Sequence, residues 1–152
     1  MSLSETRAVR RSPIIQFSVF SENKVGILSE IIGVLAAGNV HVMALSTVDT
    51  VDSSILRVIV DDPDRARELF RANGYAHNES EMLGVEMNSE EDLRAVLAAL
   101  LEAEVNIHFI YPFISRPNGR CGLALYVDDR ELAEDSLRLR AMTVIDQNDI
   151  SR

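Results

Sequence analysis

The chain has little sulfur, because Cys121 is the only cysteine among its 152 residues. One thiol excludes an internal disulfide and leaves too few thiolates for a cysteine-based metal site. The sequence also lacks any apolar run near the roughly 18 to 20 residues that a membrane span needs. With 47% hydrophobic and 26% charged residues, the composition predicts a soluble, cytoplasmic, globular protein that makes no contact with a membrane.

Basic residues are scarce as well. The 15 Lys and Arg residues face 24 Asp and Glu residues, the net charge is -9, and no run of Lys or Arg forms a patch. A phosphate backbone would be repelled, so nucleic acid is not expected as a partner. Residues 1–12 contain Arg7, Arg10 and Arg11 but lack the apolar centre of a secretory signal. We interpret this segment as a loosely held N-terminal arm, with an extra strand or a partner contact as the alternative.

Catalytic motifs are missing too. The sequence contains no nucleophile motif, phosphate-binding loop or metal-ligand spacing. His41 and His108 fall at matching positions of an internal repeat, so a shared structural role explains them, and His77 has no obvious partner. The acids near Asp49 and Asp62 fit turns and helix caps rather than a cation site. The sequence therefore predicts a protein that is not an enzyme and holds no cofactor or metal.

The first half of the chain shows clear periodicities. The apolar stripe of Ile27, Ile31 and Leu35 predicts a helix that ends at Gly38, where glycine would adopt a left-handed turn. Asp62 followed by Pro63 marks a second helix start, with Asp62 as the N-cap. The predicted strands are 14–20, 40–50, 55–60 and 75–82, the last of which could continue into 83–87, and the predicted helices are 27–38 and 63–74.

The second half repeats this order. Ser89 followed by three acids predicts a capped helix start, and Leu93, Val96 and Leu100 continue an amphipathic stripe. Pro117-Asn118-Gly119 predicts a hairpin turn between two strands. The predicted strands are 107–114, 123–127 and 142–145, and the predicted helices are 89–101 and 130–140.

The repeat can be read residue by residue. Residues 39–42 (Asn-Val-His-Val) match residues 106–109 (Asn-Ile-His-Phe) at an offset of 67 (106 minus 39), and residues 60–62 (Val-Asp-Asp) match residues 127–129 at the same offset (127 minus 60). The first helices match at 66 (Ile31 to Leu97), which requires one inserted residue at a loop.

Two copies of a βαββαβ unit follow from this repeat. We predict an α+β protein with two ferredoxin-like domains, each an antiparallel sheet with helices on one face. The predicted boundaries are residues 13–82 for the first domain and 83–150 for the second, after the arm at 1–12. A four-stranded sheet leaves edges and one face to protect, so a homodimer is expected.

The first loop carries a resemblance to a known family. Residues 23–28 read Asn-Lys-Val-Gly-Ile-Leu between the first strand and the first helix. A βαββαβ unit with such a loop resembles an ACT domain, in which the loop is usually Asp or Asn, one residue, then Pro-Gly-x-Leu. Asn23, Gly26 and Leu28 match that pattern, whereas Val25 replaces the usual proline. The resemblance implies a tandem pair over residues 14–150 that binds amino acids where domains meet.

The loop residues have chemistry suited to such a ligand. Amides in the first helical turn can donate to a carboxylate, and the Asn23 side-chain oxygen can accept from an ammonium group. Gly26 would let a ligand approach the backbone, although turn geometry alone also explains Asn23 and Gly26. The predicted ligand-binding loop is Asn23, Lys24, Val25, Gly26, Ile27 and Leu28.

The second copy differs at the same place. Its loop, residues 87–92, has no glycine and contains three acids, which would oppose a ligand carboxylate. The domain pairing that the resemblance implies would instead bring Ile110, Tyr111 and Phe113 to the first loop as a side-chain pocket. Packing in a core or a dimer interface is the alternative for these residues. Pairing between chains would replace them with residues 43–45.

Together these features predict a non-catalytic regulatory protein. It would bind a free amino acid at an ACT–ACT interface and modulate a partner enzyme or regulator, because the chain shows no output domain of its own. The apolar residues around the predicted pocket favour an apolar or aromatic ligand side chain. The alternative is a ligand-free interaction module or regulatory subunit of an enzyme.

Overall fold

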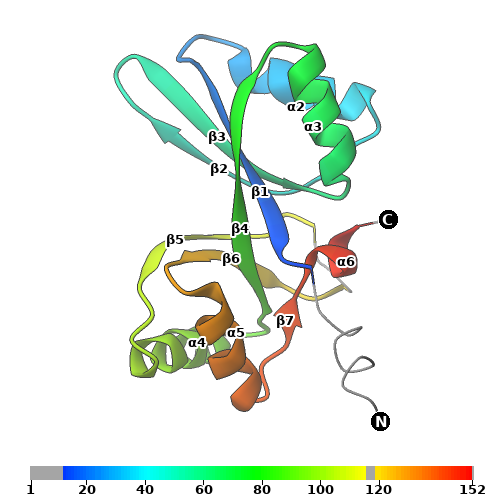
Figure 1. The fold of residues 1–152 in the computed structure, drawn as a ribbon. Helices are drawn as coiled ribbons and strands as arrows, with labels where there is room; N and C mark the ends of the chain where they lie inside the picture. Colours follow the sequence, from blue (N-terminus) through cyan, green and yellow to red (C-terminus); the bar gives the residue numbers. More distant parts are fainter. Residues whose placement is uncertain (1–11, 116–118, 152) are drawn as a thin grey trace.

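The computed structural model describes residues 12–115 and 119–151 (Figure 1). The predicted turn at 117–119 lies partly outside these residues, and so does the arm apart from Ser12. In chain order the elements are β1 (Ile14–Glu22), α2 (Ile27–Ala37), β2 (Val42–Asp49), β3 (Ser53–Val60), α3 (Pro63–Ala72), β4 (Ala76–Glu86), α4 (Glu90–Glu102), β5 (Ile107–Pro112), β6 (Gly122–Val127), α5 (Arg130–Leu139), β7 (Val144–Ile145) and α6 (Gln147–Ile150).

The strands form one antiparallel sheet in the order β2-β3-β1-β4-β6-β5, with β7 also paired to β4. β4 pairs with β1 through Met82 and with β6 from Leu83 onward. We name the elements from β1 to Met82 the first unit and those from Leu83 to α6 the second unit. Each has the βαββαβ order and the 2-3-1-4 strand arrangement of a ferredoxin-like domain, so the predicted α+β fold is confirmed.

β4 belongs to both units. Its N-terminal part is the last strand of the first unit, and its C-terminal part is the first strand of the second, so the predicted segments 75–82 and 83–87 are one continuous strand. Along the β4 edge that pairs with β1, Ile14 lies opposite Met82 and Ile145 opposite Gly84. β7 therefore ends close to the point where β1 begins. The two strands lie along the same edge of β4, β1 beside its N-terminal part and β7 beside its C-terminal part.

The sheet curls until its outer strands meet. Ala44 of β2 forms a bridge with Phe113, and the Ile114 amide donates to the Met43 carbonyl at 2.7 Å. The two pairs of helices lie at opposite ends of the molecule (Figure 1). Each pair covers a core of its own unit. A third core lies between the units and consists of Ile14, Ala44, Ile59, Met82, Tyr111, Phe113, Ala124, Ile145 and Ile150.

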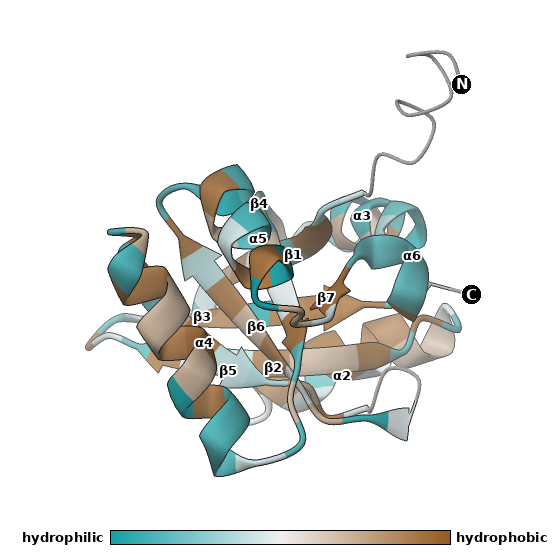
Figure 2. Cartoon of the chain, turned by 90° about the horizontal axis from the view of Figure 1, so that it is seen from below, coloured by the Kyte–Doolittle hydropathy of each residue, from teal (hydrophilic) through white to brown (hydrophobic). Residues whose placement is uncertain are grey.

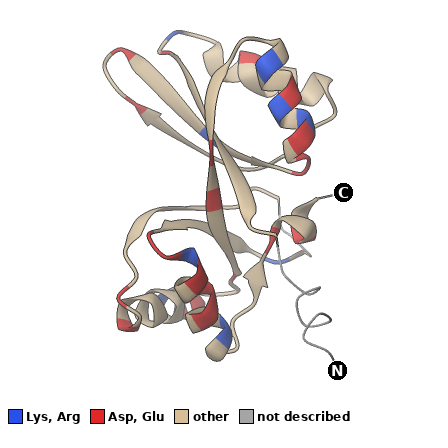
Figure 3. Cartoon of the chain, in the orientation of Figure 1, with Lys and Arg blue, Asp and Glu red and all other residues tan. Residues whose placement is uncertain are grey.

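Polarity follows these layers. Hydrophobic residues dominate the strands, whereas hydrophilic and hydrophobic residues alternate along the helices (Figure 2). Charged residues are frequent on α3 and α5, which carry both acids and bases, and in the connecting loops (Figure 3). Within the described residues, no helix is long and apolar enough to cross a membrane.

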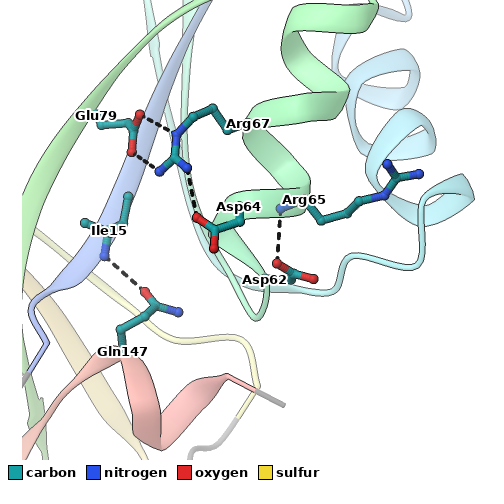
Figure 4. A network of polar contacts seen from close by, with 7 residues as sticks. All are labelled: Ile15, Asp62, Asp64, Arg65, Arg67, Glu79 and Gln147. Atoms are coloured by element: carbon teal, nitrogen blue, oxygen red, sulfur yellow. Dashed lines mark hydrogen bonds and ion pairs between the residues drawn. The ribbon is translucent and has the colours of Figure 1, made fainter.

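An ion-pair network fastens α3 to β4 (Figure 4). The Arg67 guanidinium donates to both carboxylate oxygens of Glu79 at 2.8 and 2.6 Å, and to Asp64 at 2.9 Å. The hydrogen bond from Arg67 lowers the pKa of Glu79. Its bidentate geometry makes this pair stronger than an ordinary surface ion pair.

The C-terminal turn was not predicted from the sequence. Residues 144–145 alone form the strand expected over 142–145, and α6 follows at once, closed by a capping box between Asp146 and Asp149. Gln147 is buried; its side chain accepts from the Ile15 amide at 3.1 Å (Figure 4) and donates to the Val60 carbonyl at 3.1 Å. The Gln147 side chain therefore bonds to both β1 and β3, just after β7 ends.

Helix termini confirm several sequence signals and correct one. Asp62 and Asp129 accept from the amides of Arg65 and Leu132, as N-caps do. The left-handed residue after α2 is Asn39, with φ 61°, whereas Gly38 has φ -85°. A Cβ atom on Gly38 would lie 2.4 Å from a Leu69 methyl carbon. A Cβ atom there would displace the Leu69 side chain, so Gly38 favours close packing of α2 on α3 and does not serve a left-handed turn.

The register of the repeat also needs a correction. Asp61 accepts from the His41 amide, and Asp128 accepts in the same way from the Asn106 amide. His41 therefore corresponds to Asn106, an offset of 65 (106 minus 41), and not to His108. The predicted offset of 67 holds only after the hairpins, where both helices begin with an aspartate cap. Two extra residues thus belong to the β5–β6 connection, and the histidines have no shared role.

Candidate ligand site at the start of helix α2

The loop between β1 and α2 ends in a residue with a positive φ. Gly26 occupies the N-cap position with φ 86° and ψ -2°, a conformation that side chains disfavour. Its carbonyl accepts from the Glu30 amide at 3.0 Å, and the Ile27 amide donates to the Lys24 carbonyl at 3.4 Å. A Cβ atom on Gly26 would meet nothing within 4 Å. Backbone conformation, rather than crowding, explains the glycine.

α2 begins without a side-chain cap. Among the described residues, no side chain accepts from its first amides, whereas α3, α4, α5 and α6 are each capped by an Asp or Ser side chain. The amides of Leu28 and Ser29 have no hydrogen bond to any described residue. Such amides need a partner from water or a ligand, and the helix dipole favours an anion there.

A pocket of about 350 Å³ opens at this helix end. The loop and the first turn of α2 form one wall, and the facing ends of β2 and β3 form the other. Its lining residues are Asn23, Lys24, Gly26, Ile27, Leu28, Ser29, Thr47, Asp49 and Ser54. The pocket therefore lies entirely within the first unit.

The wall from β2 and β3 is polar and carries a negative charge. The Ser54 hydroxyl is buried and donates to one Asp49 carboxylate oxygen at 3.0 Å. This hydrogen bond orients the Asp49 carboxylate, and Asp49 lines the same pocket as the uncapped start of α2. The lining of the pocket thus combines the uncapped start of α2 and Lys24 with one carboxylate, that of Asp49.

The structure brings together most of the predicted loop residues. Asn23, Lys24, Gly26, Ile27 and Leu28 all line the pocket. Val25 does not, because its side chain is fully exposed. The position where the family has proline thus points away from the pocket.

The predicted second wall lies elsewhere in the chain. Tyr111 and Phe113 pack in the core between the units, and none of Ile110, Tyr111 and Phe113 lines the pocket. The Tyr111 hydroxyl donates to the buried Gln16 side-chain oxygen at 2.5 Å. Burial raises the pKa of Tyr111, an effect that Arg57 partly opposes. Within one chain, Tyr111 and Phe113 therefore pack in a core between the units, which is the alternative that the sequence left open for them.

Sequence reasoning missed Thr47, Asp49 and Ser54. Asp49 was assigned to a turn, although the predicted topology contained the signal to find it. In a ferredoxin-like unit the end of the first strand lies beside the start of the third, and here Glu22 pairs with Ser53. The hairpin between the second and third strands must therefore adjoin the ligand loop.

In the second unit, side chains of the corresponding loop bond to the amides at the start of α4. Ser89 accepts from the Asp92 amide at 3.3 Å, and the Asp92 carboxylate accepts from the Asn88 amide at 2.7 Å. The Ser89 cap occupies the Asp92 amide in the first helical turn, which a ligand carboxylate would need. Glu90 and Glu91 add negative charge in the first turn of α4.

Two ferredoxin-like units that share one strand, with a glycine loop before the first helix, define the class of tandem α+β domain pairs. The family model of the ACT domain pair matches residues 12–152. The chain therefore belongs to the ACT domain-pair family. No curated protein matches the sequence closely enough to count as a relative.

Solved structures share the arrangement over nearly the whole chain. A protein from Bacteroides thetaiotaomicron is 29% identical, with a TM-score of 0.84 over 93% of this chain and 98% of its own. The ligand-free regulatory subunit of aspartate kinase from Thermus thermophilus is 18% identical, with a TM-score of 0.59 over 83% of this chain and 89% of its own. Aspartokinase III from E. coli, in complex with lysine and aspartate, is 19% identical, with a TM-score of 0.51 over 86% of this chain and 30% of its own.

Proposed function

We propose that this chain is a non-catalytic regulatory protein that binds one free amino acid in the pocket at the start of α2. It acts as a cytoplasmic homodimer and modulates a partner enzyme or regulator. The two domains are residues 13–82, which bind the ligand, and residues 83–150. The observation that carries the proposal is a pocket that is lined both by the uncapped start of α2 and by Asp49.

The ligand would fit the pocket by charge. Its carboxylate accepts from the Leu28 and Ser29 amides beside Lys24, and its ammonium group lies at Asp49, with Asn23 as a further acceptor. The complex of aspartokinase III with lysine and aspartate supports an amino acid as the ligand class. The walls are more polar than the sequence suggested, so a small or polar ligand side chain fits better than an aromatic one.

A regulatory response requires that the protein adopt a second conformation with a different affinity for the ligand. A ligand that joins the α2 loop to the β2–β3 hairpin favours whichever arrangement holds these two segments closest. β2 also carries the Ala44–Phe113 bridge to the second unit, so a shift of β2 would reach the junction between the units. A partner that contacts both units would sense that shift.

A thermal-shift screen against the twenty amino acids tests the proposal. A ligand at about 100 times its Kd raises the free energy of unfolding by about 2.7 kcal/mol, because it binds only the folded chain. Gly26→Asp places a carboxylate at the anion end, and Asp49→Asn removes the charge at the cation end. Both should abolish the shift. If no amino acid raises the Tm at millimolar concentration, the chain is a ligand-free interaction module instead.

A further inference from the structure

The first unit has a sheet face that its helices do not cover. α2 and α3 lie on one face of its four strands (Figure 1), where they share a core with Phe17 and Val58. The strand register places two neighbouring rows of side chains on the opposite face. The apolar row consists of Val48, Ile55, Phe20 and Ala76, and the polar row consists of Ser46, Arg57, Ser18 and Asn78. Each row crosses all four strands of the unit.

The apolar row is open to solvent. Phe20 is 38% exposed and Ala76 is exposed, while the other two residues of the row are partly exposed. In the second unit the corresponding sheet face is covered, because Tyr111, Phe113 and Ala124 pack in the core between the units. Apolar side chains that lie side by side on a surface are typical of an interaction site. The first unit therefore presents a sheet surface that the second unit does not.

The polar row contains an arginine without an acidic partner. The Arg57 guanidinium carbon lies 3.7 Å from the centre of the Phe109 ring, and Phe109 stacks on Tyr126 with ring centroids 5.1 Å apart. This cation–π contact orients the guanidinium but occupies none of its N–H groups. Arg57 has no hydrogen bond or ion pair with a described residue, whereas Arg67 and Arg138 donate to glutamates at 2.6 and 2.7 Å. The Arg57 donors are therefore available to an anion.

Neutral hydrogen-bonding side chains flank Arg57. Ser46 and Ser18 lie directly opposite it on β2 and β1, and Asn78 lies opposite Ser18 on β4. These three side chains also have no hydrogen bond to a described residue. On this face of the four strands, which are all described, Glu22 at the outer end of β1 is the only acid. The row thus suits a carboxylate, which pairs well with a guanidinium and also accepts from hydroxyl groups.

We propose that this sheet face binds an acidic and apolar segment of a partner protein. A Glu or Asp carboxylate of the partner accepts from Arg57 and from the hydroxyls of Ser18 and Ser46. An apolar side chain next to that acid packs on Phe20 and Ile55. The chain has a net charge of -9, which repels an acidic segment from most other surfaces and favours this face. The inference rests on the partner of the proposed function, to which it adds the contact surface and the chemistry of the partner.

The same strands form a wall of the ligand pocket. Along β2, Ser46 and Val48 alternate with Thr47 and Asp49, which line the pocket. Successive side chains of a strand point to opposite faces of the sheet, so the amino acid and the partner contact opposite faces of β2. A shift of β2 that the amino acid favours therefore changes the partner's surface directly.

Peptide selection on the full chain tests the inference. A random-peptide phage library is selected on the immobilised wild type, and the affinities of the enriched peptides are measured by fluorescence anisotropy. The peptides should contain Asp or Glu next to an apolar residue. Arg57→Gln should weaken their binding about tenfold, because a charge-assisted hydrogen bond is lost. Arg94→Gln is the matched control, since Arg94 is an exposed arginine of α4 without an ion pair to a described residue, and it should bind like the wild type.

A double-mutant cycle separates this contact from a loss of fold. Replacing the acid of the peptide by its amide should weaken binding to the wild type but not to Arg57→Gln. Phe20→Ser should also weaken binding, because the apolar side chain of the peptide loses its contact. Enriched peptides without an acid, or equal affinities of Arg57→Gln and Arg94→Gln, would overturn the inference. Displacement of the peptide by millimolar acetate would overturn it in favour of a small-anion site.

Thermal shifts with the amino acids separate the two proposals. Arg57→Gln should retain the ligand-induced shift, because Arg57 does not line the ligand pocket. A retained shift without an Arg57-dependent peptide overturns only the partner surface. Peptide binding without any thermal shift overturns only the amino-acid ligand.

Discussion

The two units of this chain share a fold but differ at the same two places. In the first unit, α2 begins at Gly26 without a side-chain cap and borders a polar pocket, whereas in the second Ser89 caps α4. On the helical surface, the first unit carries the Arg67 ion-pair network and the second carries exposed leucines. The difference teaches that two copies of one fold can present different surfaces, with an uncapped helix start beside a polar pocket in one unit and a capped helix start with exposed leucines in the other.

The shared strand β4 predicts that the units unfold together. Phe70 and Leu137 occupy equivalent core positions, 67 residues apart, and both are fully buried. Phe70→Ala should cost about 3–5 kcal/mol of unfolding free energy and Leu137→Ala about 2–5 kcal/mol. Urea titrations followed by circular dichroism and by tyrosine fluorescence should give one coincident transition for each variant. Two separate transitions would show that the units are independent.

The contact between the two units at Gly84 leaves no room for an added side-chain carbon. A Cβ atom on Gly84 would lie 2.5 Å from the Ile14 Cδ1 atom and 3.0 Å from the Ile145 carbonyl oxygen. We expect Gly84→Ala to cost about 1–3 kcal/mol by overpacking, measured by urea unfolding. Gly33→Ala is the matched control, because its Cβ atom on α2 would meet nothing within 4 Å. That change should raise the free energy of unfolding by about 0.5–1 kcal/mol. Equal effects of Gly84→Ala and Gly33→Ala on this free energy would refute the close packing of Ile14 and Ile145 against Gly84.

Tyr111 should make the junction sensitive to alkaline pH. Its pKa is raised by burial, so its stabilising effect is complete below the ordinary tyrosine pKa near 10 and is lost as the pH rises through the higher folded-state value. Tyr111→Phe should cost about 1–3 kcal/mol at neutral pH, because Gln16 loses its donor. The substitution should also remove the decrease in unfolding free energy that Tyr111 causes at alkaline pH.

Urea unfolding at about pH 8 and about pH 11 measures both effects. Tyr126→Phe is the control, since the Tyr126 ring stacks on Phe109 and its hydroxyl has no hydrogen bond to the described residues. A Tyr111→Phe variant with the same alkaline loss as the wild type would contradict the assignment.

The cap of α4 gives the smallest expected effect. Ser89→Ala should cost about 0.5–2 kcal/mol of unfolding free energy, because the Asp92 amide loses its acceptor. Binding of the amino acid should not change, since the proposed site lies in the first unit. Thermal unfolding with and without ligand checks both statements. A change in ligand affinity would show that the second loop takes part in binding.

Much of the fold followed from the sequence because its signals are local. Apolar periodicity and the caps Asp62 and Ser89 located the helices, and the repeat gave two βαββαβ units. The register of the repeat was wrong by two residues in its first half, because two residues added between β5 and β6 shift the match without changing either strand's pattern. α6 was missed because a turn this short has no periodicity.

The site was only half predictable for a different reason. Residues 23–28 form one continuous loop, so glycine and the helix start revealed them. Asp49 and Ser54 join the site through strand pairing, and a turn assignment explained Asp49 equally well. Tyr111 and Phe113 were expected at the ligand because the arrangement of the two sheets was inferred from a resemblance. The curled sheet places them between the units instead.

Isothermal titration with the amino acid that gives the largest thermal shift tests the central claim most directly. The account predicts one ligand bound per chain in the wild type and none in Gly26→Asp, with Ser89→Ala still binding one. Two ligands per chain, or binding that survives in Gly26→Asp, would contradict it.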